Sequence, residues 1–128
     1  MNQQNTLVTA AIFGCLSVAL GAFGAHALKA TLTASGRIDT FELAVKYQFY
    51  HTVALFAFGL LMSKLPGSGM MIASTLITIG VILFSGSLYA LALTSVRAVA
   101  YITPVGGLFL LAGWVVAAYA IASKKPWL

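Results

Sequence analysis

The stretch MMIASTLITIGVILFSGSLYALAL, residues 70–93, decides the fold class of this chain. It runs for 24 residues without an Asp, Glu, Lys or Arg. At a rise of about 1.5 Å per residue, an α-helix of this length crosses a hydrocarbon core of about 30 Å. The stretch therefore predicts a transmembrane helix.

Three more apolar segments lie around this one. Residues 64–69, with Pro66 and two glycines, predict a tight turn, so the segment before them is an antiparallel neighbour. Residues 94–100 form a short loop, after which Thr103 is placed to cap a helix and Pro104 to occupy its first position. The predicted spans are 6–28, 44–63, 70–93 and 103–122, with a polar loop and helix start at 29–43. We expect a single domain, residues 1–128, with the fold of an all-α, integral membrane four-helix bundle.

The composition supports a protein dissolved in lipid. Hydrophobic residues make up 61% of the chain and charged residues 7%, whereas a soluble domain is about a quarter charged. The net charge is +5, but the basic residues are scattered between apolar segments and form no clustered face for phosphates. The expected partner is the lipid bilayer, and nucleic acid is not expected.

The first apolar segment could also be a secretory signal peptide, since Ala25-His26-Ala27 fits a small-x-small cleavage pattern. Residues 1–5 lack the positive charge of such a leader, however, and the apolar segment exceeds its usual length. We therefore expect residues 6–28 to be a retained span.

The polar connection 29–43 contains a helix-start pattern. Asp39 is placed to cap the free amides and Glu42 to complete a capping box. Ile38 and Leu43 are placed to form a hydrophobic staple around that cap. The pattern predicts that the second long helix begins next to Asp39.

An even number of spans places both termini on one side of the plasma membrane. Lysines and arginines are divided three against four between the two sides: Lys64, Lys124 and Lys125 against Lys29, Arg37, Lys46 and Arg97. This balance does not decide the orientation. We expect the termini to be cytoplasmic, with Trp127 at the membrane interface.

Small residues follow one stripe of two predicted spans. Gly14, Gly21 and Gly24 share a face of the first, and Gly106 and Gly113 share a face of the last. Because hydrophobicity does not drive association within lipid, small residues that allow close backbone approach favour helix contacts. These glycines are expected at packing surfaces, and the bundle is a possible homo-oligomer. The alternative is a close backbone approach that lines a pore.

Two histidines could meet at one end of the bundle. His26 ends the first span, and His51 lies about 10 Å below the same interface when its helix is measured at 1.5 Å per residue. Ionisable groups at this depth usually face the interior. We predict a polar cluster of His26, Tyr47, Gln48, Tyr50 and His51. It could respond to protons or hold a ligand, or it could be purely structural.

The third span carries hydroxyl groups on one face, at Ser74, Thr78, Ser85 and Tyr89. Such hydroxyls often bond to the helix's own backbone. The alternative is a polar track that faces other helices or water.

The sequence contains none of the common enzyme motifs, such as a phosphate loop, GxSxG or HExxH. Asp39 and Glu42 are explained as a cap. Two histidines without nearby cysteines fall short of a metal-ligand set, so no metal and no cofactor is predicted. We expect a non-enzymatic membrane or envelope component. The alternative is a small oligomeric channel or transporter for an ion or small solute.

Four motifs together resemble the uncharacterised bacterial membrane proteins of the YgdD/YwdK type. They are Gly21-Ala22-Phe23-Gly24-Ala25-His26, Tyr47-Gln48-Phe49-Tyr50-His51, Leu83-Phe84-Ser85-Gly86-Ser87-Leu88-Tyr89 and Thr103-Pro104-Val105-Gly106-Gly107. The resemblance covers nearly the whole chain. It implies a plasma-membrane protein with four helices, and it implies no activity and no catalytic residue.

Overall fold

The computed structural model describes residues 1–124, so the predicted positions of Lys125 and Trp127 lie outside the described residues. The elements are α1 (Gln3–Ala25), α2 (Lys29–Ala34), α3 (Ile38–Leu61), α4 (Gly69–Thr94), the short 3-10 helix η1 (Arg97–Tyr101) and α5 (Ile102–Ala122). Residues 1–124 contain no β-strand. The chain is all-α.

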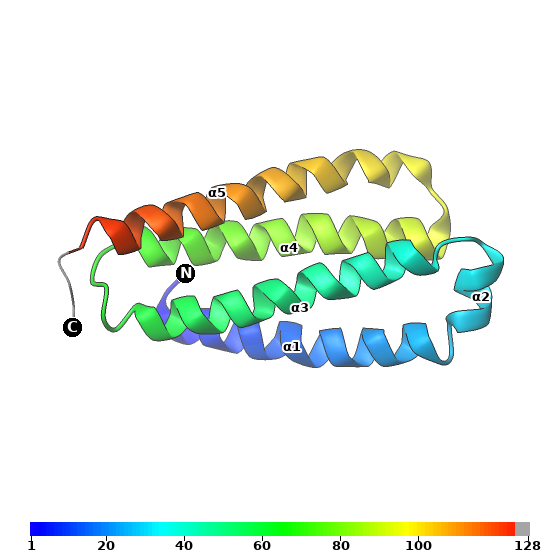
Figure 1. The fold of residues 1–128 in the computed structure, drawn as a ribbon, viewed down its shortest axis with the longest axis horizontal. Coiled ribbons are helices and arrows are strands. Elements are labelled where there is room, and N and C mark those ends of the chain that lie inside the picture. The colour runs from blue at the N-terminus through cyan, green and yellow to red at the C-terminus, as the bar shows by residue number, and fades with distance from the viewer. Residues whose placement is uncertain (125–128) are drawn as a thin grey trace.

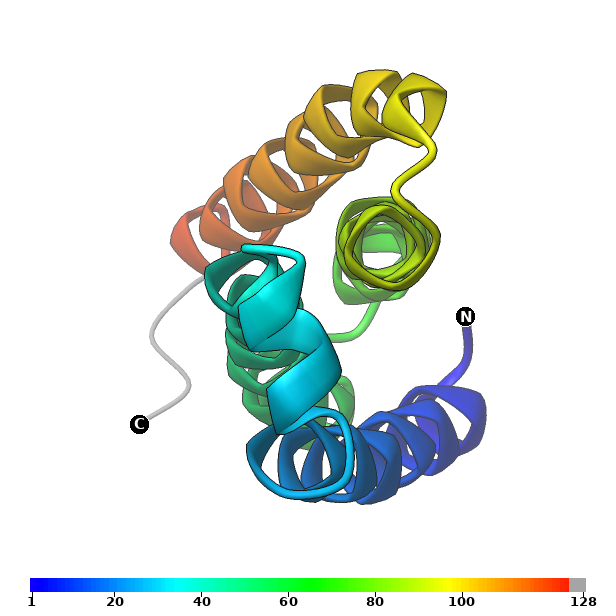
Figure 2. The same ribbon diagram turned by 90° about the vertical axis from the view of Figure 1, so that its right-hand side faces the viewer.

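Four long helices run up and down beside one another (Figure 1). α1 begins and α5 ends at the same end of the bundle, while α2 and η1 lie at the other. Viewed end-on, α3 and α4 occupy the middle, with α1 against α3 and α5 against α4 (Figure 2). The order of packing is therefore α1, α3, α4, α5. α2 reverses the chain between α1 and α3 and buries Leu32 against Phe41 and Ala92.

Three of the long helices are long and apolar enough to cross a membrane: α1, α4 and the segment 97–122, which joins η1 to α5. α3 has 24 residues but is more polar. Its polar residues Gln48, His51 and Thr52 are buried against the other helices rather than exposed to lipid. Because polar side chains at membrane depth turn inward, α3 fits among the apolar helices. The protein is an integral membrane four-helix bundle.

Glycines bring α4 and α5 into backbone contact. A Cβ added at Gly106 would lie 2.8 Å from the Cα of Phe84, and one at Gly113 would lie 2.8 Å from the Ile77 side chain. A Cβ at Gly80 would lie 2.6 Å from the Leu110 side chain. These distances are shorter than any normal carbon contact, so the two helices fit together only where side chains are missing.

The glycines of α1 are less tightly confined, except at one end. A Cβ at Gly14 or Gly21 would meet an α3 side chain at 3.4 or 3.5 Å, which is close to ordinary van der Waals contact. At Gly24 it would lie 2.6 Å from the ring of Phe41. Among the glycines of α1, the tight contact with α3 is therefore at the α2 end. At the other end it is a glycine of α3 that is confined, since a Cβ at Gly59 would lie 2.7 Å from the Leu7 side chain of α1.

The predicted cap at Asp39 is wrong. α3 begins at Ile38, its N-cap residue is Arg37, and no side chain caps it. Asp39 is exposed in the first turn. The Arg37 guanidinium instead donates to the Leu91 carbonyl, at 3.2 Å. A cation near the C-terminal end of α4 is favourable because the last carbonyls of a helix carry partial negative charge.

The predicted cap at Thr103 is also wrong. α5 begins one residue earlier, at Ile102, with Tyr101 as its N-cap residue and no side-chain cap. The Thr103 hydroxyl shares a hydrogen bond of 2.6 Å with Ser87 of α4. Pro104 lies in the first turn of α5, where a missing N–H breaks no intrahelical bond.

Candidate functional site

His51 is the most enclosed ionisable side chain among the described residues of the four long helices, with 6% of its surface exposed. Its Nδ1 lies 2.7 Å from the carbonyl oxygen of Tyr47, one turn earlier on α3. Its Nε2 lies 3.2 Å from the indole nitrogen of Trp114, on α5. Both ring nitrogens therefore have partners, one within α3 and one across the bundle.

These two partners assign the tautomer of the imidazole. A carbonyl oxygen can only accept a hydrogen bond, and an indole N–H can only donate one. Nδ1 of His51 must therefore carry the proton and donate to Tyr47, while Nε2 accepts from Trp114. A proton on Nε2 would face the Trp114 N–H and break the contact. The site holds a neutral imidazole.

Aromatic rings surround this pair. Tyr47, His51 and Phe58 share one face of α3, because they are four and seven residues apart. Tyr47 packs on Phe84 of α4 with ring centroids 4.7 Å apart. Trp114 meets Phe58 edge-on at 5.4 Å and His51 at 6.2 Å. Trp114 therefore packs on two rings of the same face of α3, and its N–H is directed at His51.

A groove of about 510 Å³ lies beside this pair, between α3 and α5. Phe84 and Leu110 line it together with His51, while Leu108 and Leu111 form its outer wall. Leu108 is 66% exposed and Trp114 is 47% exposed. Because exposed apolar residues of a membrane bundle face lipid, the groove opens sideways into the bilayer.

The structure separates the predicted polar cluster. Tyr47 and His51 lie together on the α5 side of α3. Tyr50 is 59% exposed, with its ring 6.1 Å from that of Tyr47. His26 is exposed at the end of α1. It follows the last residue of α1, Ala25, and borders a hollow lined by Ala19, Ala22 and Phe23, whereas His51 borders the groove against α5. His26 and His51 are therefore not neighbours.

Gln48 belongs to a different network, although it lies only three residues before His51 and is turned about 60° from it round α3. Its amide donates to the Phe13 carbonyl of α1 at 2.9 Å. Its oxygen accepts from the Tyr89 hydroxyl of α4 at 2.8 Å. The Ser85 hydroxyl adds a bond of 2.8 Å to the Ala44 carbonyl. These contacts join three helices, and each polar atom named here has a partner.

The other hydroxyls of the interior mostly bond to their own helices. Thr6, Ser17 and Thr52 each donate to the carbonyl four residues earlier, at 2.8 Å. Ser74 and Thr78, on α4, have buried hydroxyls with no hydrogen-bond partner within residues 1–124. The hydroxyl face of α4 therefore has two parts. Near Ser85 its hydroxyls bond to another helix, whereas the Ser74 and Thr78 hydroxyls, one turn apart, have no partner within the described residues.

Trp114 is the site residue that sequence reasoning missed. A signal was present, because tryptophan usually lies at the membrane interface, whereas Trp114 lies about 18 Å along α5 at 1.5 Å per residue. An indole N–H at that depth needs an acceptor. The sequence did not indicate which residue supplies it.

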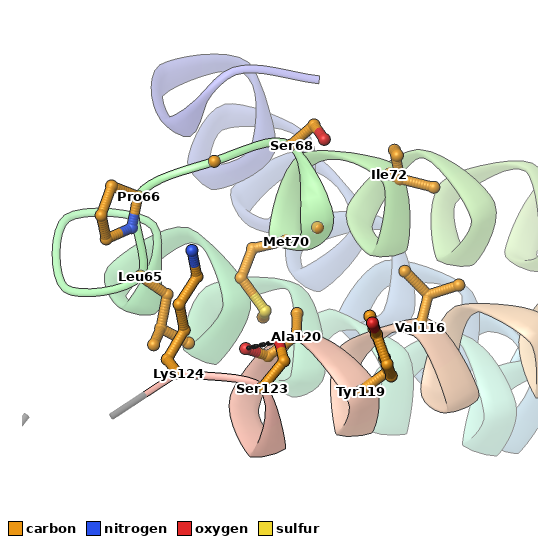
Figure 3. Close-up of a pocket in the computed structure, with 12 residues that line it drawn as sticks. Leu65, Pro66, Ser68, Met70, Ile72, Val116, Tyr119, Ala120, Ser123 and Lys124 are labelled. Carbon is orange, nitrogen blue, oxygen red and sulfur yellow. Dashed lines mark hydrogen bonds between the residues drawn. The ribbon is translucent and has the colours of Figure 1, made fainter. Parts of the chain in front are cut away.

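A second hollow, of about 410 Å³, lies at the end of the bundle where α1 begins and α5 ends (Figure 3). Met70, Val116 and Ala120 line it, and the turn 65–68 borders it. Lys124 places a cation beside this turn. This hollow lies at the opposite end of the bundle from η1, and His51 and Trp114 do not line it.

No group of three or more His, Cys, Asp or Glu that could hold a metal is found within residues 1–124. His51 also has no free ring nitrogen for a metal, because both nitrogens are engaged. Cys15 is exposed on α1. The arrangement at His51 can position a polar group of a ligand, but it does not present a ligand set for an ion.

Residues 20–107 match the family described as a protein of unknown function, DUF423. The chain belongs to this family. It is similar to the UPF0382 inner membrane protein YgdD of Escherichia coli strain K12, with 41% identity over 89% of this chain and 86% of that protein. It is also similar to the UPF0382 membrane protein of Haemophilus influenzae, with 39% identity over 97% of each chain.

A third relative is the UPF0382 membrane protein SH2409 of Staphylococcus haemolyticus, with 42% identity over 84% of this chain and 87% of that protein. No solved structure matches the chain. As a member of DUF423, the chain is a small multi-pass membrane protein. The matched family region contains His51 and ends before Trp114.

Proposed function

We propose that this DUF423 protein is a non-enzymatic component of the plasma membrane that acts through its lipid-facing surface. The observation that carries this proposal is the filled centre of the bundle. α4 and α5 touch at their backbones near Gly106, and Leu55, Ala73 and Ile77 are fully buried in one core. A path for water through a single bundle would have to cross these contacts.

The placement of the acidic residues supports a non-enzymatic role. Asp39 and Glu42 are exposed in the first turns of α3, whereas His51 lies about 20 Å from the start of that helix at 1.5 Å per residue. An active site needs convergent acid, base or nucleophilic groups around one substrate atom. The other side chains that line the groove beside His51 are aromatic or aliphatic, and the only polar groups they carry within the described residues are the Tyr47 hydroxyl and the Trp114 N–H.

The test is the reaction of introduced cysteines with a charged, membrane-impermeant thiol reagent in proteoliposomes. In a Cys15→Ala background, Ser74→Cys and Thr78→Cys report on the interior, where unpaired hydroxyls would be the first to meet entering water. Tyr101→Cys is the control, since Tyr101 is 82% exposed at the η1 end.

We expect Tyr101→Cys to react, and the two interior cysteines to react only after unfolding in detergent. Reaction of both interior cysteines in the folded protein, together with ion flux through the same proteoliposomes, would contradict the proposal. That result would support the channel or transporter alternative.

We also propose that copies of the chain associate through α1. Among the long helices, only α3 packs extensively on α1. The outward face of α1 carries the small residues Ala11, Cys15, Ala19 and Ala22 at exposed positions, and such spacing favours close helix approach in lipid. Ala19→Leu should shift cross-linked or native-mass species toward monomer, whereas Leu16→Ile, about 100° round the helix from this stripe, should not. A single monomeric species for the unmodified chain would refute self-association.

We propose cytoplasmic termini as the orientation. Ser35, between α2 and α3, and Ser68, between α3 and α4, lie at opposite ends of the bundle and are both exposed. In right-side-out vesicles of a Cys15→Ala variant, an impermeant reagent should label Ser35→Cys and leave Ser68→Cys unlabelled until the vesicles are opened. The reverse pattern would show the opposite orientation, and equal labelling would show dual insertion.

A further inference from the structure

The groove between α3 and α5 combines three properties that together define a ligand class. Its volume of about 510 Å³ falls in the usual range of small-molecule sites, about 300–1,000 Å³. It opens sideways between Leu108 and Leu111, which are 66% and 64% exposed. Its inner side holds the polar pair His51 and Trp114, and Tyr47 lines it beside them. A ligand would therefore enter from the bilayer and meet this polar pair.

The polar pair presents one donor and one acceptor next to each other. The Trp114 N–H donates, and Nε2 of His51 accepts, across 3.2 Å. A group placed between them must both accept and donate a hydrogen bond, or one partner is left unpaired. A hydroxyl does both, whereas a carbonyl or an ether oxygen only accepts. The donor and acceptor of this pair therefore favour an alcohol as the ligand.

The lining excludes a charged headgroup. No Lys, Arg, Asp or Glu is among the residues that line this groove within the described chain. An anion or cation at membrane depth needs a partner of opposite charge. A phosphate would find none beside His51, since the imidazole is held neutral by its contacts with Tyr47 and Trp114.

The depth of the pair adds a third restriction. Trp114 lies about 18 Å from the start of α5 and about 12 Å from its end, at 1.5 Å per residue. A large polar headgroup cannot reach this depth without losing its hydration, whereas a lone hydroxyl can. A molecule with one hydroxyl on an apolar chain meets all three restrictions.

We propose that this groove binds a neutral long-chain alcohol of the bilayer, whose hydroxyl inserts between the Trp114 N–H and Nε2 of His51. The two nitrogens are already bonded at 3.2 Å, so an entering hydroxyl must first displace the Trp114 ring, which is 47% exposed. The hydroxyl then accepts from the indole and donates to the imidazole, so two hydrogen bonds replace one. The apolar chain lies along Phe84 and Leu111. Gly107 leaves the groove open near Phe84, because a Cβ there would stand 3.8 Å from the Phe84 ring.

The test uses Trp114 itself as the reporter. The chain has two tryptophans, so a Trp127→Phe variant makes Trp114 the only one. This variant is placed in phosphatidylcholine nanodiscs and titrated with a long-chain alcohol that carries bromine near its hydroxyl, since bromine quenches indole fluorescence on contact. The methyl ether of the same alcohol and a bromoalkane of equal length are the matched probes.

We expect saturable quenching by the alcohol, at a mole fraction about tenfold lower than for the ether or the alkane, which corresponds to about 1.4 kcal/mol. His51→Phe should abolish the difference between the alcohol and the ether. Gly107→Leu should reduce quenching by all three probes, because its side chain fills the groove. Tyr50→Phe, on the lipid-facing side of α3, should change nothing.

Equal quenching by the alcohol and the ether in the parent protein would overturn the proposal, as would a preference that survives His51→Phe.

A photoreactive alcohol provides a second measurement on the unmodified chain, in case His51→Phe does not fold. Its adducts should map to the α5 peptide that contains Leu108 and Leu111, and excess unlabelled alcohol should suppress them while excess alkane does not. Adducts spread evenly over the lipid-facing helices would also refute the proposed alcohol site. The cysteine-reaction experiment on Ser74 and Thr78 does not involve this groove, so the two proposals can fail separately.

Discussion

The indole N–H of Trp114 donates a hydrogen bond of 3.2 Å to Nε2 of His51, and this contact joins α5 to α3 across 63 positions of sequence. α5 packs mainly on α4, and α3 packs on both α1 and α4, so this polar contact is a direct link between two helices that otherwise meet mainly through α4. Inside lipid, neither group has water as an alternative partner. The contact therefore bears on both stability and ligand binding.

Replacing Trp114 by Phe tests the strength of this contact. Phe keeps an aromatic ring against Phe58 but removes the N–H. We expect a loss of about 0.6–1.7 kcal/mol in unfolding free energy, between the average and the largest value measured for hydrogen bonds between membrane helices. A double-mutant cycle with His51→Phe in the same detergent isolates the pair. A coupling energy near zero would mean that the two residues do not interact.

Two adjacent glycines on α5 offer a matched comparison. A Cβ at Gly106 would lie 2.8 Å from the Phe84 Cα, whereas one at Gly107 would meet nothing closer than the Phe84 ring at 3.8 Å. Gly106→Ala must push the α4 and α5 backbones apart, and we expect a loss of about 1–3 kcal/mol or more. Gly107→Ala should be neutral or slightly stabilising. Equal unfolding midpoints for the two variants would contradict the close packing of α4 and α5.

A second matched pair lies on α1. Gly24→Ala would place a Cβ 2.6 Å from the Phe41 ring, while Gly21→Ala would meet Val45 at 3.5 Å. Gly24→Ala should lower the thermal unfolding midpoint, and Gly21→Ala should leave it within error or raise it, since Ala favours a helix. Phe41→Leu should recover part of the loss in Gly24→Ala, because it removes the ring atoms that clash. No recovery would place the strain elsewhere.

We expect Gln48 to contribute more to the stability of the bundle than its exposed neighbour Tyr50. Gln48→Leu removes both the bond to the Phe13 carbonyl and the acceptor of the Tyr89 hydroxyl. Leaving that hydroxyl without a partner should destabilise the bundle by about 1–3 kcal/mol. Tyr89→Phe in the same background should restore part of this loss, because no hydroxyl is then left unpaired. Tyr50→Phe serves as the control and should have no effect on unfolding in detergent.

The sequence by itself determined the class of the protein and the course of the chain. An uncharged apolar segment such as 70–93 has one stable form in lipid, a helix, because backbone groups there must bond within the segment. The structure has α4 at Gly69–Thr94. The turn near Pro66 follows from residues that cannot continue a helix. These features depend on neighbours in sequence, so sequence was sufficient for them.

Only the tertiary structure decided which side of each helix meets which neighbour. His51 was expected beside His26, yet it faces Trp114, and Gln48, three residues earlier, faces α1 and α4. The rotation of α3 about its axis is set jointly by contacts such as Gly24 with Phe41 and Ser85 with Ala44. Those contacts come from three helices that pack at once. A shift of one residue turns a side chain by about 100°, so hydrophobicity along the chain cannot fix the partner, while the packed bundle does.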